Sequence, residues 1–109
     1  MKIVKKPWGK EIIFASNPGK YLGKILKITK GQRFSYQYHE KKDETMYILK
    51  GRAAVTLSNI ISIKNEGDCI HIPHQTIHRV MALEELDIIE VSTYFPSDTI
   101  RLSDDYGRV

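Results

Sequence analysis

Four side chains are of types that bind divalent metal ions, and their spacing allows them to meet. Gln37 and His39 are two positions apart, so in an extended strand both side chains point to the same face. Glu44 follows the polar loop 40–43, and a hairpin there would bring its carboxylate beside His39. His78 follows a predicted strand that ends at Ile72-Pro73, and long-range strand pairing can bring it against this hairpin. The set would offer an amide oxygen, two imidazoles and a carboxylate.

This donor set suits a borderline divalent ion, with zinc as the first choice and manganese, cobalt, nickel or iron as alternatives. Four protein ligands would leave one or two coordination positions for water or a substrate oxygen. An ion held in this way can polarise a carbonyl group. The sequence therefore predicts one divalent metal ion as cofactor, held by Gln37, His39, Glu44 and His78.

These residues depend on strands that bring distant segments together. Short stretches rich in β-branched and aromatic residues recur roughly every 8 to 12 positions, separated by Gly- and Pro-containing turns. This spacing is typical of an all-β sandwich or barrel, and we predict a single domain over residues 1–109. One turn of helix is allowed over 97–102. The predicted strands are 11–14, 21–28, 33–39, 44–49, 53–57, 69–72, 78–81 and 86–94.

Two stretches resemble the sequence motifs of the cupin superfamily. Residues 31–51, which contain Gln37, His39 and Glu44, are similar to the first cupin motif, and residues 67–78 are similar to the second. Glutamine in place of the first histidine is the form found in phosphomannose isomerases. The resemblance implies the RmlC-like double-stranded β-helix, which is the jelly-roll barrel of cupins.

Nearly the whole chain resembles the isomerase domain that ends bifunctional mannose-1-phosphate guanylyltransferase/mannose-6-phosphate isomerases. The similar stretches are 6–11, 35–39 and the terminal 98–108. The sequence departs from these domains at His74-Gln75, where Ala-Gly is usual. The resemblance implies the same four metal ligands, and it implies that Arg108 of the terminal Tyr-Gly-Arg element takes part in sugar-phosphate isomerisation.

The implied activity is that of a metal-dependent isomerase of mannose 6-phosphate and fructose 6-phosphate, in nucleotide-sugar or polysaccharide precursor synthesis. Arg108 would pair with the anionic substrate, and His71 is a candidate acid or base that would project into the barrel. Glu11 and Glu90 are further candidates for the base. Two alternatives stay open: a non-catalytic cupin that binds a sugar or sugar nucleotide or assists polysaccharide synthesis, and a metal-dependent dioxygenase.

Composition and charge also bear on the partners and the location of the protein. The formal net charge is +4, but the lysines are scattered among acidic residues, so we predict no nucleic-acid partner. A mild positive field would instead suit a small anionic substrate. No apolar run approaches the roughly 20 residues of a membrane span, and no secretory signal pattern is present, so we expect no membrane association and a cytoplasmic location. The single cysteine, Cys69, is expected to be a small core residue.

Two further expectations concern the aromatic residues. Trp8 is predicted to close one end of the barrel rather than to stack on a sugar, because aromatic residues carry large apolar area. Tyr36, Tyr38 and Tyr47 are expected in the core or on a dimer surface. Because cupins are commonly dimers and a tyrosine-bearing sheet face would need covering, we predict a homodimer.

Overall fold

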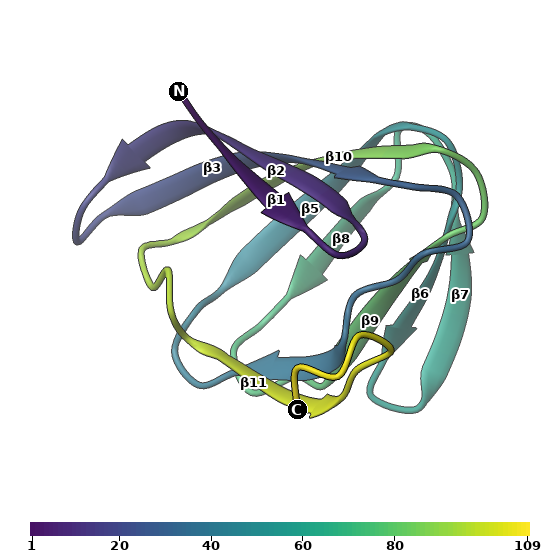
Figure 1. Cartoon of the computed structure of the whole chain (residues 1–109). Coiled ribbons are helices and arrows are strands. Elements are labelled where there is room, and N and C mark those ends of the chain that lie inside the picture. The colour runs from purple at the N-terminus through teal and green to yellow at the C-terminus, as the bar shows by residue number, and fades with distance from the viewer.

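The computed structural model describes residues 1–109, and its regular secondary structure consists entirely of β-strands. Eleven strands form two antiparallel sheets that face each other (Figure 1). The all-β fold predicted from the sequence is therefore confirmed. The chain has no helix of the length and apolar character needed to cross a membrane.

The larger sheet has six strands, and the smaller has five. In spatial order the larger sheet contains β1 (Lys2–Lys6), β2 (Gly9–Asn17), β3 (Tyr21–Ile28), β10 (Leu86–Thr93), β5 (Glu44–Lys50) and β8 (Cys69–Ile72). The smaller sheet contains β11 (Thr99–Ser103), β4 (Tyr36–His39), β9 (His78–Ala82), β6 (Ala53–Leu57) and β7 (Ile60–Lys64). Most neighbours in space are thus distant in sequence, so the site is assembled by long-range pairing.

The side chains that face inward change from apolar to polar along the central strands. On β5 the inward positions are apolar at Ile48 and acidic at Glu44. On β9 they are apolar at Val80 and end at His78, and β10 carries the buried Glu90 beyond its own apolar half. A cluster of 14 buried apolar residues fills the space between the sheets at one end. The polar side chains gather at the other end, where the burial of charge needs a partner.

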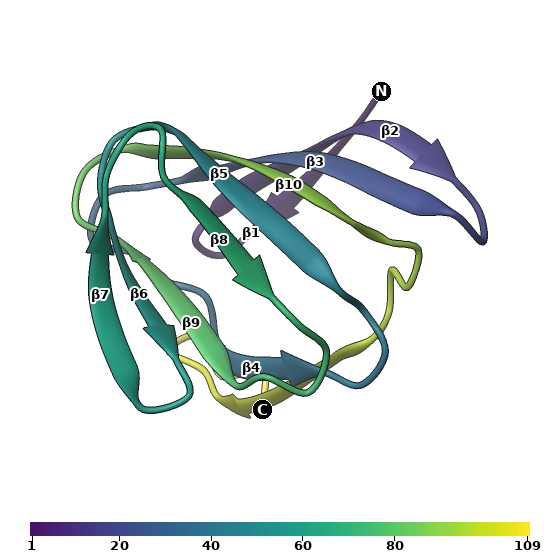
Figure 2. The same cartoon turned by 180° about the vertical axis from the view of Figure 1, so that it is seen from behind.

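The termini lie on different sheets. Seen from both sides, the β2–β3 hairpin projects beyond the rest of the molecule, and the C-terminal segment crosses the smaller sheet (Figure 1 and Figure 2). Arg33 holds this segment through two hydrogen bonds to the Asp105 carboxylate, at 2.7 and 2.9 Å. The hydroxyl of Tyr106 donates to the side-chain oxygen of Gln32 at 2.6 Å. The chain end is therefore fastened to the segment that precedes β4, where Tyr106 packs against the apolar cluster.

Eight predicted strands are present, and 21–28, 53–57 and 69–72 have the predicted bounds. Three observed strands, β1, β7 and β11, were not predicted. The helical turn allowed over 97–102 is wrong, because β11 pairs there with β4. The predicted strand over 33–39 is shorter, since Arg33 makes only an isolated bridge to Met81 before β4 begins.

Candidate metal centre

His39, Glu44 and His78 meet in one buried cluster. They come from the end of β4, the start of β5 and the start of β9, and each offers a ligand atom within 4.8 Å of the others. His39 Nε2 lies 3.4 Å from Glu44 Oε2, and His78 Nε2 lies 3.7 Å from Glu44 Oε1. Three of the four predicted ligands are thus brought together by strands that are far apart in the sequence.

Both imidazoles are oriented by the backbone. His39 Nδ1 donates to the carbonyl of Asp98 at 3.1 Å, and His78 Nδ1 donates to the carbonyl of Thr76 at 2.9 Å. With the proton on Nδ1, each Nε2 carries a lone pair toward Glu44. Both Nε2 atoms are buried without a hydrogen-bond partner.

The electrostatics keep His39 neutral. Burial lowers the pKa of His39 to about 4, and the Lys42 ammonium adds to this effect, while the hydrogen bond to Asp98 opposes it. A metal ion requires a neutral imidazole with a free lone pair and an ionised carboxylate. The donors of this cluster therefore fit a divalent metal ion.

Gln37 lies beside the cluster rather than within it. It is the register partner of His78 across β4 and β9, and it lines the adjoining pocket. Its side-chain oxygen accepts a hydrogen bond from the Ser35 hydroxyl at 2.5 Å. Because an amide oxygen has two lone pairs, this bond leaves one available for a metal ion. The assignment of Gln37 as the fourth ligand stays a prediction.

Lys42 was not predicted to take part, yet its ammonium lies between two buried carboxylates. Lys42 Nζ is 2.8 Å from Glu44 Oε2 and 3.2 Å from Glu90 Oε2. Burial opposes its charge, but the attraction of Glu90 and Glu44 outweighs burial, so the pKa of Lys42 is raised. The sequence signal for this role was the position of Lys42 two residues before Glu44, because side chains two positions apart in an extended chain point to the same face.

Two of the candidate bases reach the pocket. Glu90 is buried, and its pKa is raised by burial and by the neighbouring Glu44, against the attraction of Lys42. Glu11 is also buried, but its ion pairs with Lys24 and Lys6, at 2.8 and 3.4 Å, outweigh burial and lower its pKa. The two carboxylates therefore differ in basicity although they share one pocket.

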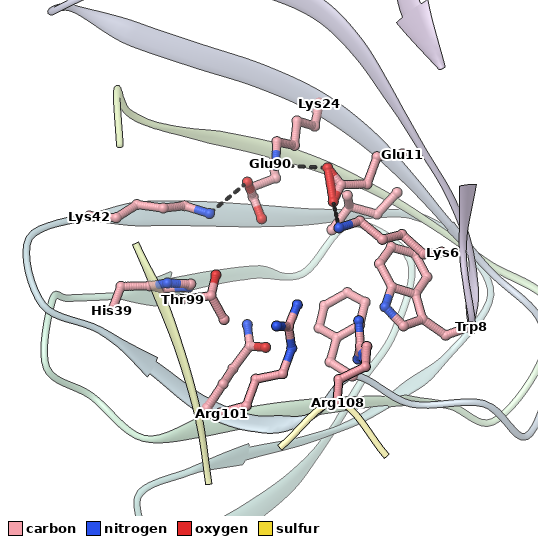
Figure 3. A pocket seen from close by; sticks show the side chains of 13 residues that line it. Lys6, Trp8, Glu11, Lys24, His39, Lys42, Glu90, Thr99, Arg101 and Arg108 are labelled. Atoms are coloured by element: carbon pink, nitrogen blue, oxygen red, sulfur yellow. Dashed lines mark hydrogen bonds and ion pairs between the residues drawn. The ribbon is translucent and has the colours of Figure 1, made fainter. Parts of the chain in front are cut away.

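The pocket lies between the two sheets and is lined mainly by polar side chains (Figure 3). Its volume is about 60 Å³. A larger hollow of about 640 Å³ under β1, β2 and β3 shares Lys6, Glu11 and Lys24 with it. The lining residues include His39 of the cluster and Gln37, together with Lys6, Trp8, Glu11, Lys24, Leu26, Phe34, Lys42, Glu90, Thr99, Arg101 and Arg108.

Arg108 and Trp8 both line this pocket. The Arg108 guanidinium donates to both carboxylate oxygens of Asp104, at 2.9 Å from Nε and 2.8 Å from Nη2. Its charge is therefore already paired within the terminal segment. Trp8 is buried and packs against Phe34 with the ring centroids 4.6 Å apart, which suits its expected place as a closing residue.

His71 does not project into the barrel, and this expectation was wrong. Its side chain is 61% exposed, and Nε2 lies 2.8 Å from Asp43 Oδ1. β8 alternates so that Ile70 and Ile72 face the core, which turns His71 outward. Cys69 is exposed for the same reason, so its expected core position is also wrong. His71 therefore lies outside the candidate site.

Two loops fix the position of His39. The Asp98 carboxylate accepts backbone hydrogen bonds from Glu40, Lys41 and Lys42, which holds the loop between β4 and β5. From the other side, the backbone N–H of Gln75 donates to the backbone carbonyl of His39 at 2.5 Å. Gln75 has a φ of 63°, a conformation that glycine adopts more readily, and it is the second residue of the His74-Gln75 departure.

Comparison with known proteins identifies the family. Residues 1–108 match the protein family described as mannose-6-phosphate isomerase C-terminal. The chain belongs to this family. It is 34% identical over 115 aligned positions to a mannose-1-phosphate guanylyltransferase of Escherichia coli K12, with 97% of the chain aligned. The alignment covers 23% of that relative, so the chain spans about a quarter of its length.

Solved structures confirm the cupin fold of this family member. KdgF from Halomonas sp. superposes with a TM-score of 0.80 at 23% identity, covering 89% of each chain. An RmlC-like cupin from Shewanella frigidimarina superposes with a TM-score of 0.79 at 16% identity, covering 88% of this chain and 86% of the other. At such identities the likeness concerns the fold alone.

Proposed function

We propose that the chain is a metal-dependent aldose–ketose isomerase that interconverts mannose 6-phosphate and fructose 6-phosphate. The family supports this proposal. The observation that carries it is the pair of buried, unpartnered Nε2 atoms of His39 and His78, which converge on Glu44 beside a pocket rich in charged side chains. A divalent ion bound by these residues, with Gln37 as the further ligand and zinc as the first choice, would polarise the substrate carbonyl.

Glu90 is the base in this proposal. Its carboxylate takes the proton from C2 of the aldose and returns it to C1, while the hydroxyl proton at C2 passes to the oxygen at C1. The raised pKa brings Glu90 nearer the working pH, where a general base is most effective. Lys42, 3.2 Å from Glu90, offers a fixed positive charge beside the carboxylate. Glu11 is the weaker candidate because Lys24 and Lys6 lower its pKa.

The deciding experiment is a coupled assay of mannose 6-phosphate turnover with Zn²⁺, Mn²⁺ and Co²⁺ added in turn. We expect turnover by the wild type and a loss of at least about 100-fold in kcat for Glu90→Gln at unchanged metal content. Glu11→Gln, the matched exchange in the same pocket, should cost less.

Two outcomes would contradict the proposal. Near-stoichiometric metal without turnover would leave the alternative of a non-catalytic cupin that binds a sugar or sugar nucleotide. Full kcat in Glu90→Gln would keep the isomerase but remove Glu90 as its base.

A further inference from the structure

Five cationic side chains line the pocket, and four of them are already paired with carboxylates. Lys6 and Lys24 contact Glu11, and Lys42 contacts Glu44 and Glu90. Arg108 makes its two hydrogen bonds to Asp104. The fifth is Arg101, whose side chain has no ion pair and no hydrogen bond to any residue of the chain.

Arg101 is also the one of these cations with a buried, unsatisfied donor. Its Nε is inaccessible to solvent and lacks a hydrogen-bond partner. The rest of the Arg101 side chain is only partly buried, but a donor shut off from water with no acceptor is costly to the folded protein. The Arg101 guanidinium can therefore bind an anion that enters the pocket.

The register of the smaller sheet places Arg101 near the metal cluster. Arg101 of β11 is opposite Gln37 of β4, and Gln37 is opposite His78 of β9. Two strand spacings, about 10 Å, therefore separate the backbone of Arg101 from that of His78. Figure 3 shows Arg101 extending into the pocket from the side of Arg108, across from Glu90 and Glu11.

We infer that Arg101 binds the phosphoryl group of the substrate. The inference rests on the proposed function, which supplies a phosphate monoester as the ligand. A guanidinium offers two parallel N–H donors that match two phosphate oxygens, so it recognises this group better than an ammonium does. Arg108, which the sequence resemblance favours for an anionic contact, is already paired with Asp104, and these bonds stabilise the turn of the terminal segment.

The test measures equilibrium binding of mannose 6-phosphate, and of inorganic phosphate as a competitor, to the zinc-loaded full chain. We expect Arg101→Met to weaken binding of mannose 6-phosphate about 10- to 100-fold, because a hydrogen-bonded pair of charges is lost. Arg101→Lys should recover part of the affinity, since it keeps the charge but loses the planar pair of donors. The surface variant Arg52→Met, which removes an exposed guanidinium paired with Glu84, should bind as the wild type does.

Zinc content and thermal melting show whether each variant is folded, and Arg101→Lys carries the test if Arg101→Met is not. Unchanged affinity in the Arg101 variants, with a loss in Arg108→Met, would overturn the inference and make Arg108 the anion-binding residue. A wild type that binds neither mannose 6-phosphate nor phosphate would also overturn it.

The two proposals can fail separately. Binding that depends on Arg101 in a chain without turnover would support the anion site and contradict the isomerase. Turnover with an unchanged KM in Arg101→Met would support the isomerase and contradict the anion site.

Discussion

His39 and His78 each use one ring nitrogen on a backbone carbonyl and leave the other facing Glu44. The backbone bonds fix the tautomer, so the free lone pair points inward without any rearrangement. His71, which pairs with Asp43, differs in that its ring is exposed and lies outside the cluster. The contrast between these histidines comes from burial and orientation, because the residue type is the same.

This contrast gives a direct test of the ligand set. His78→Ala should lose bound zinc, with a fall in affinity larger than the roughly 10- to 100-fold expected when only an outer partner of a ligand is removed. Gln37→Ala should also lose metal if the amide oxygen is the fourth ligand. His71→Ala, the matched control, should keep it. Elemental analysis of the purified variants measures the outcome, and full metal content in His78→Ala would refute the assignment.

The pKa of His39 predicts how the metal-free protein responds to acid. The folded protein protonates His39 near pH 4, whereas the unfolded chain does so near pH 6.5, so between these values the unfolded state binds more protons. The contribution of neutral His39 to stability is complete above pH 6.5 and is lost as the pH falls toward 4, by up to about 1.4 kcal/mol per pH unit.

Denaturant unfolding between pH 4 and 7 measures this effect. The free energy of unfolding of the wild type, relative to His39→Gln, should decrease as the pH falls through the window set by the two pKa values. A difference that does not change with pH would mean that burial does not hold His39 neutral.

At the scale of single elements, the strands that sequence patterns miss are all edge strands. β1 ends the larger sheet, and β7 and β11 end the smaller one. β1 and β7 have the same burial pattern, in which no residue is buried. Burial of one face is what requires apolar and polar residues to alternate, so an edge strand that buries neither face lacks the period-two pattern. β8, the remaining edge strand, was predicted because Ile70 and Ile72 face the core.

The turns offer a matched pair of glycines. Gly51 and Gly67 have the same φ of 89°, but a side chain on Gly51 would collide with the carbonyl oxygen of Glu85, whereas the space beside Gly67 is open. Gly67→Ala should therefore cost about 1 kcal/mol of stability for the left-handed backbone alone. Gly51→Ala should cost at least about 2 kcal/mol more, because the backbone of the neighbouring turn must move.

Urea unfolding of both variants measures this difference. Equal losses of stability in Gly51→Ala and Gly67→Ala would contradict the close approach of the two turns.

At the scale of the whole molecule, the two sheets divide the interior into an apolar end and a polar end. The apolar cluster includes Ile48 and Val80, and the same strands end at Glu44 and His78. The core therefore positions these candidate ligands rigidly, since the strands that carry them are anchored by buried apolar side chains. One domain over 1–109, expected from the sequence, stays a prediction with which this single core agrees.

The predicted homodimer belongs to this scale and stays a prediction. The three tyrosines do not share one sheet face, because Tyr36 and Tyr38 are on β4 of the smaller sheet and Tyr47 is on β5 of the larger. The Tyr36 hydroxyl also donates a hydrogen bond within the chain, to the carbonyl of Ser58. The expectation of a homodimer therefore rests on the fact that cupins are commonly dimers. Light scattering at working concentration should give twice the chain mass, and a monomer would contradict it.

The sequence alone determined the fold class and the three residues of the buried His/Glu/His cluster. Alternation depends only on local geometry and placed Gln37 and His39 on one face, whereas the resemblance to the two cupin motifs predicted that Glu44 and His78 join them. The alternation of Ile70 and Ile72 with His71 indicates that His71 turns outward, although the expectation for His71 did not use it. The pairing of β8 with β5 confirms this orientation and excludes His71 from the pocket.

Tertiary structure alone decided how the charges pair. Lys42 meets Glu90 across 48 positions of sequence, and Arg108 is paired with Asp104 while Arg101 is left without a partner. A charged residue has the same appearance in sequence whether it is solvated, paired or buried alone. Its free energy depends on the distances to the other charges and on its exposure to water, and these quantities exist only once the sheets have closed.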